Sequence, residues 1–128
     1  MRENISSGSY LEPIIGFSRL VKVGNHIVIG GTAPIGVDGK CHGVGDIEAQ
    51  TRRCFDIALA TLEKVGASFS DVVRTRLILT NIADWEIAAK VHGEIFGEIR
   101  PVTTTMAVSG FVDPDWLIEI EIDAVVGD

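Results

Sequence analysis

The stretch that decides the fold is Leu117-Ile-Glu-Ile-Glu-Ile-Asp-Ala-Val-Val126, in which acidic and aliphatic side chains alternate. Side chains of a β-strand point alternately to opposite faces, so this period of two predicts a strand with one aliphatic and one acidic face. We expect the aliphatic face to pack against helices. An earlier segment, residues 72–80, carries Arg74 and Arg76 at the same spacing, and we expect these arginines to face the acids as cross-strand partners.

Six further segments show a regular period: strands at 16–23, 26–31, 72–80 and 103–108, and helices at 46–66 and 85–96. The first helix is the clearest, because Asp46 is a good N-cap, apolar residues follow at a spacing of three to four, and Gly66 suits its end. The resulting order, β-β-α-β-α-β-β, predicts an α+β fold with the helices on one face of a mixed sheet. We expect a single domain over residues 1–128, with residues 1–12 as a mobile arm.

Composition limits the classes of function. The 128 residues are 46% hydrophobic and 23% charged, which is typical of a folded globular domain. The net charge of −7 argues against a nucleic-acid partner, because phosphate backbones are bound by clustered basic residues. Two cysteines, a polar first segment and the lack of a long apolar stretch predict a cytoplasmic protein without a membrane partner.

No motif predicts a metal or a cofactor. Cys41 and His42 are adjacent, and the other cysteine and histidines do not show the spacing of zinc ligands. The glycines between residues 30 and 45 lack the strand, tight turn and helix of a nucleotide-binding fingerprint. An ordinary loop accounts for both features better.

Two pairs of polar residues remain as candidates for a site. Thr103 and Thr105 point the same way on a strand, where they could bind a ligand or simply reflect the β-propensity of threonine. Glu119 and Glu121 share a strand face, where one could act as a general base or both could be ion-paired and solvated. Spacing alone favours the structural interpretation of each pair.

Taken together, several segments resemble the RidA family, also called YjgF or UK114 and historically L-PSP endoribonuclease. The similar segments are His26-Ile-Val-Ile-Gly-Gly31, Asp46-Ile-Glu-Ala-Gln-Thr51, Leu62-Glu-Lys-Val-Gly-Ala67, Asp71-Val-Val-Arg-Thr-Arg-Leu-Ile-Leu-Thr80, Pro101 and Leu117-Ile-Glu-Ile-Glu121. The resemblance implies a chorismate-mutase-like fold and a homotrimer with small-molecule clefts between subunits. It also implies hydrolysis of reactive enamines and imines, such as 2-aminoacrylate, to keto acids and ammonia.

The resemblance places six residues of this chain in the pocket. Gly31 and Glu119 match the family pattern, and Glu119 is the catalytic candidate. The others depart from it: Phe17 stands for a tyrosine, Ala89 for an asparagine, Thr103 for an arginine and Thr105 for a cysteine.

The change at Thr103 matters most, because that arginine binds the substrate carboxylate in the family. A threonine offers one neutral hydroxyl in place of a charged, bidentate clamp. We therefore expect an arginine-lacking member in which 2-aminoacrylate is a doubtful substrate. Arg19 and Arg100 are the candidates for a replacement cation.

Two hypotheses follow for the function. In the first, Glu119 positions a water for attack on an imine, while Gly31, Thr103 and Thr105 hold the ligand. In the second, the same cleft binds a small metabolite without turning it over. A ribonuclease ranks third, because the chain is acidic and has no recognisable pair of catalytic histidines.

Overall fold

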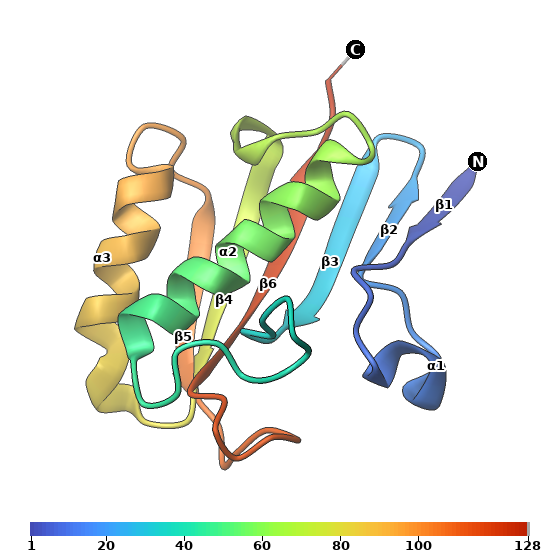
Figure 1. The fold of residues 1–128 in the computed structure, drawn as a ribbon. Helices are drawn as coiled ribbons and strands as arrows, with labels where there is room; N and C mark the ends of the chain where they lie inside the picture. The colour runs from blue at the N-terminus through green and yellow to red at the C-terminus, as the bar shows by residue number, and fades with distance from the viewer. Residues whose placement is uncertain (128) are drawn as a thin grey trace.

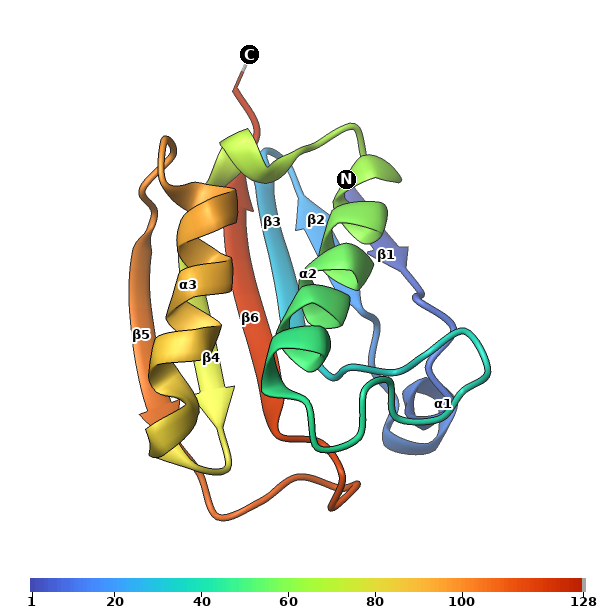
Figure 2. The same cartoon turned by 60° about the vertical axis from the view of Figure 1, so that its left-hand side comes forward.

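The computed structural model describes residues 1–127 and contains one six-stranded sheet with two long helices on one face (Figures 1 and 2). The strands are β1 (Arg2–Ile5), β2 (Leu20–Val23), β3 (His26–Thr32), β4 (Val72–Leu79), β5 (Val102–Ala107) and β6 (Ile118–Val125). The helices are α1 (Leu11–Ile15), α2 (Ile47–Glu63) and α3 (Trp85–Phe96), with short 3₁₀ turns at Phe69–Asp71 and Ile82–Asp84. The expected α+β class and the helix-covered mixed sheet are confirmed.

The strand order is β1-β2-β3-β6-β4-β5, and every neighbouring pair is antiparallel except the parallel pair β4 and β5. The last strand of the chain therefore lies in the middle of the sheet. Its aliphatic residues Ile118, Ile120 and Ile122 are fully buried. Burial of three isoleucines stabilises the fold by roughly 1.5–3 kcal/mol each, which explains why this segment takes the central position.

Helix α2 packs on the sheet through a buried face that is mostly apolar, with Gln50, Thr51 and Thr61 as its polar members. Cys54, Ala58 and Leu62 are all fully buried. The helix begins as expected, since the Asp46 carboxylate accepts a hydrogen bond of 3.0 Å from the Ala49 amide. The helix itself ends at Glu63, and Gly66 takes a positive φ of 75° in the turn that follows.

The opposite face of the sheet carries the charged rows. Arg76 forms an ion pair of 2.8 Å with Glu121, and Arg74 lies 3.6 Å from Asp123. The expected pairing of the arginine row with the acidic row is thus confirmed. Glu119, the remaining acid of the row, lies opposite Ile78 of β4 and receives no arginine from that strand.

The N-terminal segment differs from the expectation. Residues 1–12, expected as a mobile arm, instead provide the edge strand β1 and the start of α1. The strand expected from residue 16 begins only at Leu20, because Gly16 adopts a left-handed conformation that ends α1. Glu12 is buried and accepts hydrogen bonds from the backbone amides of Ser7 and Ser9, which holds the segment against the sheet. No helix within residues 1–127 is long and apolar enough to cross a membrane.

Candidate active site

The site begins at an irregularity in β3. Ile29 pairs with Ile122 and Thr32 with Ile120, so Gly30 and Gly31 together oppose a single residue of β6. Such a bulge bends a strand and changes where neighbouring side chains point. Two consecutive glycines are suited to it, because they leave room for another chain segment to approach the backbone.

The carboxylate of Glu119 occupies the room left by Gly31. A Cβ atom placed on Gly31 would lie only 2.5 Å from Glu119 Oε1, whereas one placed on Gly30 would meet nothing within 4 Å. The missing side chain at residue 31 therefore determines where the carboxylate of Glu119 can lie. Both residues that match the family pattern belong to this single contact.

Glu119 differs electrostatically from the other acids of β6. Within residues 1–127, no basic nitrogen lies within 4 Å of its carboxylate, whereas Glu121 and Asp123 are both ion-paired. Burial raises the pKa of Glu119, and the neighbouring charge of Glu121 adds to this, while Arg19 acts in the opposite direction. A partly desolvated carboxylate with a raised pKa is a stronger base than an ordinary glutamate.

Arg19 is the cation whose charge acts on this carboxylate. Its side chain is almost fully buried, with 4% of the residue surface exposed. Its Nε donates to Ser7 Oγ at 3.1 Å, and its Nη1 donates to the carbonyl of Gly31 and, at 3.3 Å, to Thr32 Oγ1. The guanidinium carbon also lies 5.1 Å from the centre of the Phe17 ring. Burial lowers the pKa of Arg19, while Glu12 and Glu119 oppose this, and an arginine stays charged under such conditions.

A pocket of about 350 Å³ opens beside these residues. Its polar part consists of Glu119, Arg19, Ser9, Ser18 and the Gly30–Gly31 backbone. Its other walls are mainly apolar and consist of Leu11, Ile15, Phe17, Ala33, Ile35, Val112 and Trp116. Trp116 is 3% exposed, and its Nε1 is the single buried side-chain nitrogen or oxygen without a hydrogen-bond partner in the part of the chain that the structure describes. We call this cavity the Glu119 pocket.

The other predicted site residues lie elsewhere. Thr103 and Thr105 are on the edge strand β5, Ala89 is on α3, and none of the three lines the Glu119 pocket. Strand β4 separates β5 from β6 in the sheet. The prediction thus divides into a Glu119 wall (Phe17, Gly31 and Glu119) and a Thr103 wall (Ala89, Thr103 and Thr105), which one copy of the chain does not bring together.

Hydrogen bonds connect the Thr103 wall to the interior. Thr75 Oγ1 donates to Thr103 Oγ1 at 2.7 Å and lies 2.7 Å from His92 Nε2. Because the single hydroxyl proton of Thr75 goes to Thr103, His92 Nε2 must carry the proton of its own hydrogen bond. The Thr103 hydroxyl proton is then left for a partner outside this chain of hydrogen bonds.

Of the two replacement cations considered, Arg19 lies in the Glu119 pocket and Arg100 does not. Arg100 follows α3, with a left-handed φ of 57°, and its Nε donates to the carbonyl of Gly97 at 3.0 Å. Sequence reasoning missed Trp116 and Leu11 as pocket residues. Leu11 begins the five-residue helix α1 in a segment without a visible period, and Trp116 lies in the irregular stretch before β6.

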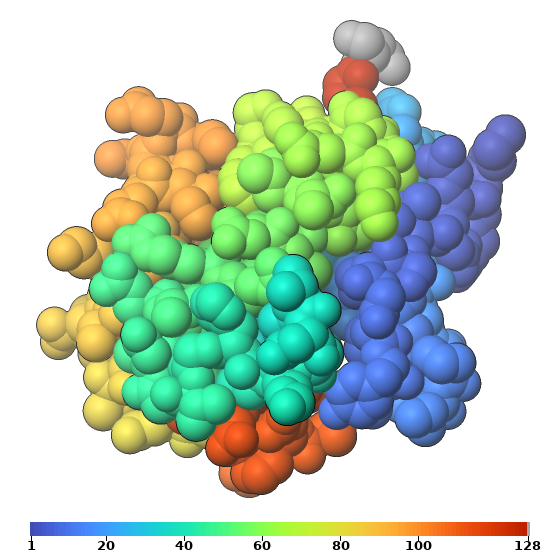
Figure 3. Space-filling view, viewed as in Figure 1, coloured from blue at the N-terminus to red at the C-terminus, as the bar shows by residue number. Residues whose placement is uncertain are grey.

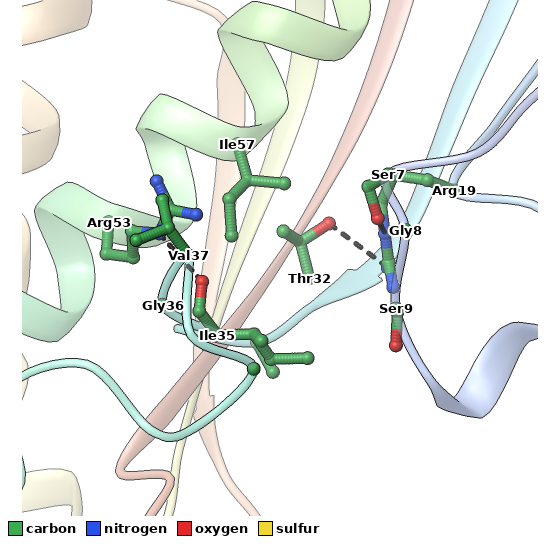
Figure 4. A pocket seen from close by; sticks show the side chains of 12 residues that line it. Ser7, Gly8, Ser9, Arg19, Thr32, Ile35, Gly36, Val37, Arg53 and Ile57 are labelled. Atoms are coloured by element: carbon green, nitrogen blue, oxygen red, sulfur yellow. Dashed lines mark hydrogen bonds between the residues drawn. The ribbon is translucent and has the colours of Figure 1, made fainter.

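A second cavity, of about 310 Å³, lies on the helix side of the sheet, between the N-terminal segment, the loop after β3 and α2 (Figures 3 and 4). Arg19 contributes to both cavities. Arg53 of α2 lines only the second one, which we call the helix-side cavity.

Comparison with known proteins identifies the relatives of this fold. The sequence profile of the family described as endoribonuclease L-PSP matches residues 8–126, which is nearly the whole chain. The chain belongs to this family, the family of the RidA and YjgF proteins. The resemblance noted in the sequence is therefore confirmed.

Individual family members agree with this result. The crystal structure of Rv2704 from Mycobacterium tuberculosis, a member of the YjgF/YER057c/UK114 family, is 40% identical and matches with a TM-score of 0.89, over 98% of this chain and 100% of that one. A RutC family protein of Pyrococcus abyssi is 37% identical over 110 residues, which cover 86% of each chain. A protein of Dermatophagoides farinae named 2-iminobutanoate/2-iminopropanoate deaminase is 29% identical and covers 77% of each chain.

Proposed function

We propose that this family member binds a small imine or enamine in the Glu119 pocket and hydrolyses it to a keto acid and ammonia. The observation that carries the proposal is the state of Glu119: a carboxylate pressed against Gly31, without an ion-pair partner within residues 1–127, and with a pKa raised by burial. The deaminase name of the mite relative supports the same class of reaction.

The chemistry requires one base that can also return its proton. Glu119 would take a proton from a water as the water oxygen bonds to the imine carbon. The same carboxyl group would return this proton to the former imine nitrogen, which gives a carbinolamine. It would then take the hydroxyl proton of the carbinolamine and pass it to the nitrogen, so that the C–N bond breaks, ammonia leaves and the C=O bond forms. A raised pKa suits both steps, because the group has to accept and release a proton near neutral pH.

Arg19 would provide the positive charge that Thr103 cannot. An anionic substrate between Arg19 and Glu119 would have its carboxylate near the guanidinium and its imine carbon near the base. Hydrogen bonds to charged groups contribute about 1.5–3 kcal/mol, so this arrangement could offset much of what is lost with the family arginine. The cation would then lie on the Glu119 wall rather than on the Thr103 wall.

We also propose a homotrimer in which the Thr103 wall of one copy closes the Glu119 pocket of the next. The separation of the two walls within one chain supports this assembly, as does the charged, helix-free face of the sheet. Light scattering coupled to size-exclusion chromatography should give three times the chain mass of 13.8 kDa. A monomer at assay concentration would contradict the shared cleft but not the role of Glu119.

The second candidate function is a metabolite-binding module without turnover. The uncharged Thr103 wall favours it, because no side chain of Ala89, Thr103 or Thr105 carries a charge to bind a substrate carboxylate. A thermal-shift screen of small carboxylates would identify ligands, since a ligand of the native state raises Tm. We place the protein in the cytoplasm, which both free cysteines support.

The deciding experiment measures ammonia release from 2-iminopropanoate generated in the assay, with the spontaneous rate subtracted. We expect Glu119→Gln to lower turnover at least ~100-fold, the lower range for loss of a general acid–base. Glu121→Gln is the matched control on the same strand face, and we expect less than a threefold change. Equal loss in both variants, or none in either, would reject the proposed role of Glu119, and binding without turnover in the wild type would favour the second candidate.

A further inference from the structure

The helix-side cavity is built around two arginines that come from distant parts of the chain. Figure 4 shows Arg53 on the α2 side and Arg19 on the side of the N-terminal segment, with Thr32 and Ile57 between them. The cavity volume of about 310 Å³ is at the lower end of the range for small-molecule sites. The space between these arginines is therefore large enough for a small metabolite.

Both arginines lack a carboxylate partner. Arg52, Arg74 and Arg76 each have an acidic oxygen within 4 Å, and Arg52 has two, from Glu48 and Glu94. No such pair forms at Arg19 or Arg53 within residues 1–127.

The lack of ion pairs at Arg19 and Arg53 is unexpected in a chain with 18 acidic and 11 basic residues, in which carboxylates outnumber cations. A buried cation is costly unless other groups compensate its charge, and Arg19 is only 4% exposed. Four arginines have no ion pair within residues 1–127, and two of these four, Arg19 and Arg53, line the same cavity.

Each guanidinium also keeps donors that the described residues do not use. Arg53 Nε donates to the Ile35 carbonyl at 2.7 Å, while its two terminal nitrogens have no hydrogen bond within residues 1–127. Arg19 uses Nε and Nη1. The nearest buried acid, Glu12, already accepts from the Ser7 and Ser9 amides and the Ser7 hydroxyl.

We propose that the helix-side cavity binds a small aliphatic carboxylate, with its carboxylate between Arg19 and Arg53 and its hydrocarbon part against Ile35 and Ile57. Guanidinium groups match the planar geometry of a carboxylate and bind it through paired hydrogen bonds. The aliphatic lining favours this class over inorganic phosphate, which would leave the isoleucine side chains without contact. The site does not depend on turnover at Glu119, although Arg19 is shared by both cavities.

Binding is tested by titrating isotope-labelled protein with butyrate, and separately with phosphate at matched ionic strength, while NMR signals are followed. We expect butyrate to shift the amide signals of Thr32 and Ile57 and the Nε–H signal of Arg53. Arg53→Met should weaken butyrate binding at least tenfold. Arg52→Met, one residue away and ion-paired on the outer side of α2, should weaken it less than twofold.

A second variant protects the test against local unfolding in Arg53→Met. Ile57→Glu places a carboxylate in the cavity itself, and we expect it to abolish butyrate binding while signals from β4 and β5 keep their positions. Equal affinity in the Arg52 and Arg53 variants would overturn the proposal, as would shifts confined to Phe17 and Trp116 of the Glu119 pocket. Tighter binding of phosphate than of butyrate would overturn the assigned ligand class.

Discussion

Glu119 on β6 and Thr103 on β5 both stand where the family resemblance places pocket residues, and the structure surrounds them in opposite ways. Glu119 is partly desolvated and has no ion pair among the described residues, and burial raises its pKa. Thr103 is neutral, exposed and hydrogen-bonded to the buried Thr75, which in turn contacts His92. The first arrangement leaves a carboxylate without an ion-pair partner, whereas the second engages the Thr103 oxygen in an internal hydrogen bond and leaves only its hydroxyl proton for a ligand.

This difference helps to separate reactive from supporting positions. An unpaired, partly buried carboxylate lowers stability, and a fold retains such a group chiefly where it serves a reaction or a ligand. A threonine that accepts an internal hydrogen bond contributes to stability even when no ligand is present. We therefore expect chemistry to depend on the Glu119 wall and only the strength of binding to depend on the Thr103 wall.

Among substitutions that distinguish the two walls, we expect the largest loss of turnover at Gly31. In Gly31→Ala the new methyl group must displace the Glu119 carboxylate, since its Cβ would lie 2.5 Å from Oε1. We expect turnover of 2-iminopropanoate to fall about 100-fold, because a small misplacement of a catalytic group can have that effect. Gly30→Ala is the matched control, because a Cβ there meets nothing within 4 Å. Similar losses in both variants would show that the bulge as a whole, rather than the contact with Glu119, is needed.

A smaller effect is expected on the other wall. Thr103→Val removes the acceptor of the Thr75 hydroxyl and the hydroxyl left for a ligand, so we expect KM to rise several-fold with kcat nearly unchanged. The lost internal hydrogen bond should lower the free energy of unfolding by about 1 kcal/mol. Thr104→Val, on the opposite face of β5, controls for the higher β-propensity of valine. A fall in kcat as large as that in Glu119→Gln would contradict the assignment of chemistry to one wall alone.

The sequence predicted the position of Glu119 on the polar face of its strand, but it did not predict how the surrounding pocket is assembled. The alternation in residues 117–126 placed Glu119 on the polar face, and the family pattern separated it from Glu121. The sequence could not show the bulge at Gly30–Gly31, because glycine carries no periodic signal. The shift in register that makes the bulge depends on how β3 pairs with β6. The sequence also could not show that β4 lies between β5 and β6, since strand neighbours are set by tertiary packing.

The burial of Arg19 was equally hidden from sequence. It depends on hydrogen bonds to Ser7 in the N-terminal segment and to Gly31 and Thr32 in β3. The spacing of these residues from Arg19 in the sequence does not predict the contacts. Trp116 follows the irregular Asp113–Pro114 loop, where no period indicates the direction of a side chain. Both residues became part of the site only through contacts between distant segments.

A third prediction concerns the effect of the unpaired carboxylate on stability. A carboxyl group with a raised pKa in the folded state binds its proton more tightly there than in the unfolded chain. Its contribution to stability is therefore present at low pH and is lost as pH rises through the raised pKa. We expect Glu119→Gln to be more stable than the wild type at about pH 8 and no more stable at about pH 3, below the ordinary glutamate range. Urea unfolding at matched protein concentration measures this, and a variant less stable than the wild type at both pH values would show that Glu119 is structural.

The smallest effect is a change of protonation on the Thr103 wall. Burial lowers the pKa of His92, so the ring stays neutral in the folded state at a pH where a free histidine begins to bind a proton. The hydrogen bonds fix which nitrogen carries the proton, because Thr75 donates to Thr103 and can only accept from His92. Nitrogen NMR of the imidazole should thus show the Nε2–H tautomer near neutral pH, with protonation delayed to a lower pH than in a free histidine. Since Thr103→Val frees the Thr75 proton to point toward His92, that variant should gain a population of the Nδ1–H tautomer. An unchanged tautomer in the variant would mean that Thr103 does not orient this chain of hydrogen bonds. The internal hydrogen bonding that distinguishes the Thr103 wall from the Glu119 wall would then depend on His92 alone.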